Sequence, residues 1–189
     1  IAFVMLNHSA GVYGDAAIAA MTVVQRIMQF AASAMIGYGQ GFQPVCGFNF
    51  GAKKYDRVKD GVKFCTKSSL LVLIAFSVIG IVFAPQLIAK FRDDPEVIAI
   101  GVRTLRFQCI SFPLVGWIII SNMMAQTIGY TVRASIMGMG RQFLFFVPCL
   151  YIMSAVMGLT GIEASQMAAD IIGFVVSLAI GIDILKKMK

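Results

Sequence analysis

The fold is decided by an uncharged stretch, SSLLVLIAFSVIGIVFAPQLIA, at residues 68–89. Its 22 residues are mostly apolar, and about 20 such residues suffice to cross a bilayer as a helix. Similar uncharged stretches occupy residues 27–52, 107–132 and 142–162, and a fifth, 164–182, contains only Asp170. Five candidate spans in one chain predict an all-α membrane protein, a polytopic bundle of transmembrane helices.

Composition excludes the main soluble classes. The 189 residues are 59% hydrophobic and 13% charged, with a mean hydropathy of +0.84, whereas a soluble domain is about 45–50% apolar and about 25% charged. The net charge is +7, but the basic residues lie between the apolar stretches rather than along one DNA-sized groove. We therefore do not expect a soluble enzyme, a disordered linker or a partner of nucleic acid.

Local signals place the helix ends. Asp94-Pro95-Glu96 is a helix start, because the aspartate caps free N–H groups and the proline has no N–H to leave unpaired. Asp15 is the predicted cap of the first full helix. Residues 1–12 are expected to be the end of a truncated helix, because the pattern opens mid-helix. The predicted transmembrane helices then span residues 16–50, 66–85, 95–128, 133–157 and 163–185.

Three basic regions must share one side of the membrane, because two spans separate each from the next. Eleven of the sixteen Lys and Arg residues lie there: Lys53, Lys54, Arg57, Lys59, Lys63, Lys67, Arg133, Arg141, Lys186, Lys187 and Lys189. The other side carries Asp15, Asp93, Asp94 and Glu96. Cytoplasmic loops are enriched in Lys and Arg. The basic side and the C-terminus are thus predicted to be cytoplasmic, in a multi-pass protein of the plasma or inner membrane.

Polar side chains recur at helical spacing on three of the spans. Such residues are costly in lipid and usually face the bundle interior or water. We predict that they line a substrate or ion pathway, comprising Gln25, Arg26, Gln29, Gln40, Gln43, Gln108, Asn122, Gln126 and Asp170. The alternative is that these groups only join helices through hydrogen bonds. Arg26 and Asp170 are the deepest ionisable groups, and they either pair with each other or lie near helix ends.

Glycine and proline mark places where helices bend or approach closely. Gly39, Gly41 and Pro44, with Pro113 and Pro148, are the predicted hinge residues, since proline removes a backbone hydrogen bond. The pairs Gly37/Gly41 and Gly47/Gly51 are predicted to bring helices into contact.

The sequence lacks the catalytic motifs and metal-ligand sets that would indicate an enzyme. It contains no GxSxG or HExxH motif. Its four cysteines form no CxxC and its only histidine is His8, so no metal set is expected. We predict a protein that is not an enzyme and needs no metal or organic cofactor.

Several short motifs resemble one transporter family. YGDAAIAAM at residues 13–21 is followed by Arg26-Ile27, Gly39-x-Gly41-x-Gln43-Pro44, and Asn49-x-Gly51-Ala52-Lys53 with Arg57. Weaker matches are Gln126, Gly129, Arg141-Gln142 with Pro148, and Gly158-x-x-Gly161 before Asp170. Together they resemble the C-terminal half of the multidrug and toxic compound extrusion (MATE) transporters, over essentially the whole chain.

The resemblance implies one six-helix lobe of a two-lobe (6+6) antiporter, with the N-terminal lobe as its missing partner. Such proteins export amphipathic or cationic small molecules in exchange for H⁺ or Na⁺. A sodium-coupled branch carries a cation-binding carboxylate on its tenth helix, whereas the matching stretch here, 107–132, contains no acid. The coupling acid is therefore expected in the N-terminal lobe.

Two other functions remain open from the sequence. A lipid-linked oligosaccharide flippase of the same superfamily shares the fold, but it needs cationic side chains in its cavity to hold pyrophosphate. A non-transporting membrane scaffold would have dry helix contacts in place of a hydrated pathway.

Overall fold

The computed structural model describes residues 2–188, without the side chains of residues 2–4, 7 and 8. Every element in this range is helical, and five helical segments are long and apolar enough to cross a membrane. The predicted all-α membrane bundle is thereby confirmed. The elements are α1 (Ala2–Gly11), α2 (Asp15–Gly51), α3 (Tyr55–Val82), α4 (Ala84–Ala89), α5 (Pro95–Thr127), α6 (Thr131–Met139), the π-helical turn η1 (Gly140–Leu144), α7 (Phe146–Met157) and α8 (Leu159–Lys187).

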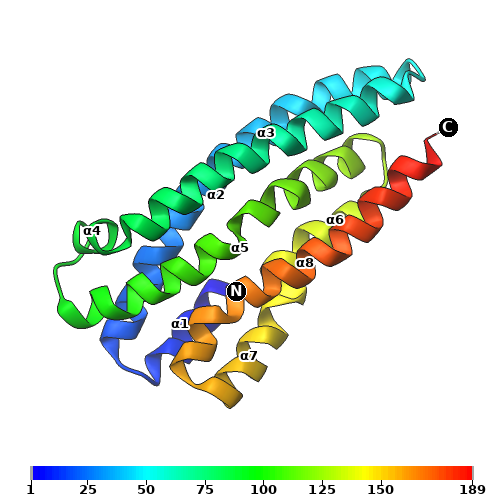
Figure 1. The fold of residues 1–189 in the computed structure, drawn as a ribbon. Coiled ribbons are helices and arrows are strands. Elements are labelled where there is room, and N and C mark those ends of the chain that lie inside the picture. The colour runs from blue at the N-terminus through cyan, green and yellow to red at the C-terminus, as the bar shows by residue number, and fades with distance from the viewer. Residues whose placement is uncertain (1, 189) are drawn as a thin grey trace.

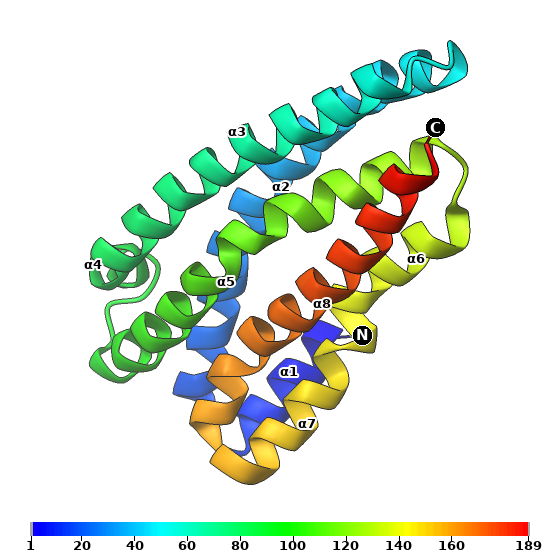
Figure 2. The same ribbon diagram turned by 45° about the vertical axis from the view of Figure 1, so that its right-hand side comes forward.

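Helix α5 is the centre of the bundle. It packs against α2, α3 and α8, and Figures 1 and 2 show it lying between these helices. Leu105, Phe112, Val115, Ile120 and Met124 on α5 are buried, in contrast to the many exposed apolar residues of α3. The outward-facing apolar side chains of helices such as α3 are not covered by other helices, as expected for a protein surrounded by lipid.

Small residues allow the helices to approach α5. A Cβ added to Gly39 of α2 would lie 3.0 Å from the Ile119 side chain, and one added to Gly47 would lie 3.0 Å from Thr127. Gly37 and Gly41 have open space around the corresponding position. The predicted contacts at Gly37, Gly41 and Gly51 are therefore wrong, and the one at Gly47 is confirmed. Helix α2 turns Gly39 and Gly47 toward α5, and sequence spacing alone does not distinguish these faces.

The predicted helix 133–157 is not one continuous α-helix. The structure divides it into α6, η1 and α7, with Pro148 in the first turn of α7. The Phe145 N–H donates to the Gly140 carbonyl, five residues back, at 2.8 Å. Pro148 has no N–H to give to the Leu144 carbonyl, so the α-helical ladder is interrupted here and a π-helical turn fills the gap. Pro44 and Pro113 lie inside α2 and α5.

The two predicted helix starts differ in outcome. Asp94 is the N-cap of α5, and its Oδ1 accepts a hydrogen bond from the Glu96 N–H at 3.0 Å. Asp15 is already the first residue of α2, whose N-cap is Gly14 with no side-chain hydrogen bond. The capping prediction for Asp15 is wrong, and its carboxylate can act only through the helix dipole.

The connections fall at two ends of the bundle. The α2–α3 turn, the α5–α6 turn and the end of α8 lie at one end in Figure 1, which we call the basic end. The α1–α2, α4–α5 and α7–α8 turns lie at the other. Arg141 was predicted to be a loop residue of the basic end, but it lies inside a span, in η1. Lys189 lies outside the described residues.

Candidate functional site

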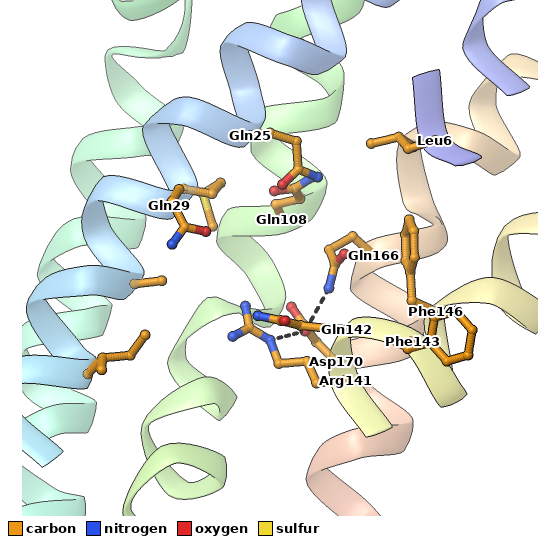
Figure 3. Close-up of a pocket in the computed structure, with 13 residues that line it drawn as sticks. Leu6, Gln25, Gln29, Gln108, Arg141, Gln142, Phe143, Phe146, Gln166 and Asp170 are labelled. Atoms are coloured by element: carbon orange, nitrogen blue, oxygen red, sulfur yellow. Dashed lines mark hydrogen bonds and ion pairs between the residues drawn. The ribbon is translucent and has the colours of Figure 1, made fainter. Parts of the chain in front are cut away.

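A cavity of about 460 Å³ lies among helices from both halves of the chain (Figure 3). We call it the amide cavity, because glutamine side chains are its most frequent polar lining. Its lining residues are Leu6 of α1, Gln25, Met28, Gln29, Ala32 and Ile36 of α2, Gln108 of α5, Arg141, Gln142 and Phe143 of η1, Phe146 of α7, and Gln166 and Asp170 of α8.

Asp170 organises the polar side of this cavity. Its Oδ1 accepts hydrogen bonds from Arg141 Nε at 2.7 Å and from Gln166 Nε2 at 3.1 Å, both drawn in Figure 3. Its Oδ2 accepts one from the Ser111 hydroxyl at 3.2 Å. Asp170 is buried and the Arg141 side chain is mostly buried. A buried carboxylate is tolerated when it is paired and hydrogen-bonded, so the cavity wall carries two opposite charges and no net charge.

Arg141 lies in the π-helical turn η1, directly after Gly140. A Cβ added to Gly140 would lie 2.6 Å from the Phe145 ring, so a larger residue there would force the ring to move. The wider turn of a π-helix shifts the residues that follow it around the helix axis, and such turns are frequent at functional sites. The sequence interpretation missed Arg141. The available signal was Gly140 followed eight residues later by Pro148, inside an otherwise apolar span.

The rest of the lining combines neutral polar and apolar surface. Gln25 and Gln29 are one helical turn apart on α2, and Gln108 faces them from α5, as Figure 3 shows. Phe143 and Phe146 lie on the other side. Amides donate and accept hydrogen bonds without adding a fixed charge. This surface suits a molecule that has both a polar and an apolar part.

Three other predicted pathway residues form a separate cluster. Gln43 donates to Gln126 at 3.5 Å, Gln126 donates to Asn122, and Asn122 donates to the Ala134 carbonyl at 3.1 Å. This chain links α2, α5 and α6 nearer the basic end. None of the three amide side chains lines the amide cavity.

Arg26 and Gln40 lie apart from both groups. Both are exposed, and Arg26 forms no ion pair within residues 2–188. The proposed alternative of an Arg26–Asp170 pair is therefore wrong. Arg26 lies about 100° around α2 from Gln25 and about 60° from Gln29, and it does not line the amide cavity.

Two further ion pairs join α8 to other helices, and a third lies within α8. Glu163 is fully buried and its Oε1 lies 3.1 Å from Arg103 Nη2 of α5, while its other oxygen has no partner among the described atoms. Near the basic end, Asp183 Oδ2 lies 2.7 Å from Arg133 and 2.9 Å from Lys187. The sequence interpretation missed both, because Arg103 and Arg133 are 60 and 50 positions from their acids.

No group of three His, Cys, Asp or Glu side chains within the described part of the chain is placed to hold a metal ion. The four cysteines are unpaired.

Comparisons with a family model and with individual proteins point to the same family. The family model described as MatE matches residues 1–152. The multidrug export protein MepA of Staphylococcus haemolyticus is 26% identical over 166 residues, which cover 88% of this chain and 36% of MepA.

Solved structures share the fold. A multidrug resistance MATE family transporter of the MOP superfamily, in its outward-facing conformation, matches 99% of this chain at a TM-score of 0.91 and 19% identity. Its inward-facing counterpart matches 99% at 0.89 and 18% identity. The match covers 42% and 43% of those chains, so this chain spans less than half the length of the proteins it resembles. The family model covers most of the sequence, and the chain belongs to the MatE family.

Proposed function

We propose that the protein containing this chain is a secondary active antiporter that exports amphipathic or cationic small molecules. The coupling ion is H⁺ or Na⁺, and this chain supplies one of two lobes in the plasma membrane, with the basic end facing the cytoplasm. The relative MepA, described as a multidrug export protein, supports this class of substrate.

The amide cavity is the observation that carries the proposal. Multispecific binding needs apolar surface with a few polar groups that accept different partners. The lining provides this with three glutamines on α2 and α5, and with Phe143, Phe146 and Met28. Its only arginine is paired with Asp170, so no free cation is left to hold a pyrophosphate. This favours an amphipathic or cationic cargo over a lipid-linked oligosaccharide.

Transport by rocking of whole lobes explains the similarity to two conformations. The chain has TM-scores of 0.91 and 0.89 against the outward-facing and inward-facing transporter. If α1–α8 rearranged during transport, one conformation would match much less well than the other. Alternating access by near-rigid movement of one repeat against the other supports a site at the lobe interface.

The test is efflux by the full-length protein in everted membrane vesicles, followed with a fluorescent cationic dye. We expect dye movement that stops when the H⁺ and Na⁺ gradients are both collapsed. Replacing Gln29 or Gln108 with Ala should change the rate or the set of dyes exported. The matched control is Gln40→Ala, because Gln40 is exposed and does not line the cavity.

Two results would count against the proposal. Equal export by the Gln29, Gln108 and Gln40 variants would remove the cavity from the pathway. Dye efflux by the 189-residue chain alone, without a second lobe or self-assembly, would refute the two-lobe interpretation.

A further inference from the structure

The turn between α2 and α3 has an unusual residue at its tightest point. The Lys53 N–H donates to the Phe50 carbonyl at 3.0 Å, and the Lys54 N–H donates to the Asn49 carbonyl at 2.9 Å. These two bonds define a Schellman motif, in which the residue after the helix cap takes a left-handed conformation. That residue is Lys53, with φ 58°, and it is the only non-glycine residue of 2–188 with positive φ.

The α5–α6 turn at the same end provides an internal comparison. Its Gly129 N–H donates to the Gln126 carbonyl at 3.3 Å, and its Tyr130 N–H donates to the Ala125 carbonyl at 2.9 Å. The motif is the same, but its left-handed residue is glycine, with φ 87°. Glycine avoids the steric cost of this conformation. A lysine that persists at such a strained position motivates a hypothesis of function.

Lys53 belongs to a cationic cavity. A hollow of about 600 Å³ lies over the α2–α3 turn, and we call it the basic cavity. Its lining residues are Lys53, Lys54, Tyr55, Asp56, Arg57, Lys59 and Met188. None of its four cations forms an ion pair within the described part of the chain. Asp56 supplies the one carboxylate, so the lining keeps a clear positive excess.

The start of α3 adds to this field. Its N-cap is Lys54, which provides no side-chain hydrogen bond to the first turn. The positive end of a helix with an uncapped first turn favours an anion. The cations and the helix start therefore converge on the same hollow.

The exposed face of α3 favours a lipid as the source of the anion. Phe64 and Leu71 are 70% and 74% exposed, and they begin an apolar face that continues along α3. Phe64 is about 14 Å along the helix from Tyr55, at 1.5 Å per residue. The basic cavity lies beyond the end of this apolar face, on the side where the headgroups of surrounding lipid are expected. Clusters of Lys and Arg next to a transmembrane helix attract anionic lipid headgroups.

We propose that the basic cavity binds the phosphate of an anionic phospholipid, with the acyl chains against the exposed face of α3. Lys53 and Arg57 hold the phosphate, and the left-handed backbone at Lys53 places its ammonium group over the cavity. This binding is independent of export through the amide cavity.

The experiment uses the full-length protein purified in detergent. Native mass spectrometry measures retention of phosphatidylglycerol during titration, with phosphatidylcholine and inorganic phosphate as comparison ligands. We expect preferential retention of phosphatidylglycerol, and inorganic phosphate at equal concentration should not displace it. Each cation near an anionic surface contributes about fivefold in affinity, so Lys53→Gly and Arg57→Gln should each weaken retention by about that factor.

Lys53→Gly separates binding from folding. Glycine relieves the left-handed strain, so this variant should melt at the same or a higher temperature while it loses lipid. The charge-matched control is Lys186→Gln, an exposed cation of the same end that does not line the cavity. It should retain lipid like the unchanged protein.

Three results would overturn the proposal. Equal retention of phosphatidylcholine would show that the cations play no part. Full displacement by inorganic phosphate would assign the cavity to a soluble anion. A loss with Lys186→Gln as large as with Arg57→Gln would show a diffuse charge effect rather than a site.

Discussion

Arg141 Nε lies 2.7 Å from Asp170 Oδ1, and this contact joins the π-helical turn η1 to α8. The two residues are 29 positions apart and belong to different spans. The pair lines one side of the amide cavity and neutralises the buried carboxylate of Asp170. Its consequences for stability and for the pathway can be measured separately.

Replacing one member of this pair should destabilise the protein more than replacing both members. Loss of one partner leaves an uncompensated buried charge, which costs about 3–5 kcal/mol. We expect Arg141→Gln and Asp170→Asn each to lower the melting temperature of the full-length protein in detergent. The double variant should recover much of the loss, because no charge is left unpaired. Strictly additive losses in this double-mutant cycle would show that the two groups are not energetically coupled.

Gln43, Asn122 and Gln126 form the cluster near the basic end. Within it, Asn122 should contribute to stability and Gln43 to export. Asn122 is 8% exposed and donates to the Ala134 carbonyl, so Asn122→Ala should lower stability by about 1–2 kcal/mol. Gln43 is less buried and its bond to Gln126 is long, so Gln43→Ala should change stability by about 0.5 kcal/mol or less.

Export by the same variants tests the pathway assignment of this cluster. Gln43→Ala should alter the rate or the choice of exported dye, with melting temperature almost unchanged. Normal export together with a large loss of stability would assign Gln43 to a dry helix contact.

Gly161 should be among the least replaceable residues. A Cβ there would overlap the Met153 carbonyl oxygen across the α7–α8 turn, and only backbone movement can relieve such a clash. Gly161→Ala should reduce the yield of folded protein and its melting temperature by more than any single hydrogen-bond deletion.

The matched control is Gly41→Ala, where nothing lies within 4 Å of the added atom. Alanine in an exposed helix interior stabilises by about 0.5–1 kcal/mol relative to glycine. If Gly41 is also a hinge, this variant should export more slowly while melting at a higher temperature. A fully active and more stable Gly41→Ala would remove it from the predicted hinge residues.

Orientation in the membrane can be tested by thiol labelling in intact cells. The variants start from full-length protein in which the cysteines of this chain are replaced. A cysteine at Asp93, which is exposed at the end opposite the basic end, should react with an impermeant reagent. A cysteine at Lys54 should react only after permeabilisation, because cytoplasmic loops carry the excess of Lys and Arg. Asp93 is preferable to Asp94, whose side chain caps α5. The reverse labelling pattern would invert the topology.

The sequence by itself determined the number of candidate membrane spans and their helical nature. In a bilayer every backbone polar group must be paired within the protein, and an uncharged stretch of about 20 residues satisfies this only as a helix. The stretch at 68–89 therefore predicted a span without knowledge of any neighbour. The cap at Asp94 was equally local, because its hydrogen bond to Glu96 joins residues two positions apart.

Only the tertiary structure decided which polar side chains meet. Spacing placed Gln25 and Gln29 on one face of α2, but which face meets α5 depends on packing, and packing directed Gly39 and Gly47 inward and Gly41 outward. Asp170 pairs with Arg141, which lies 29 positions away in the π-helical turn, and helical periodicity does not predict such a turn. Periodicity determines faces within one helix, because it is set by bonds four residues apart. Partners between helices are set by how several surfaces pack at once, and that information lies in the assembled bundle.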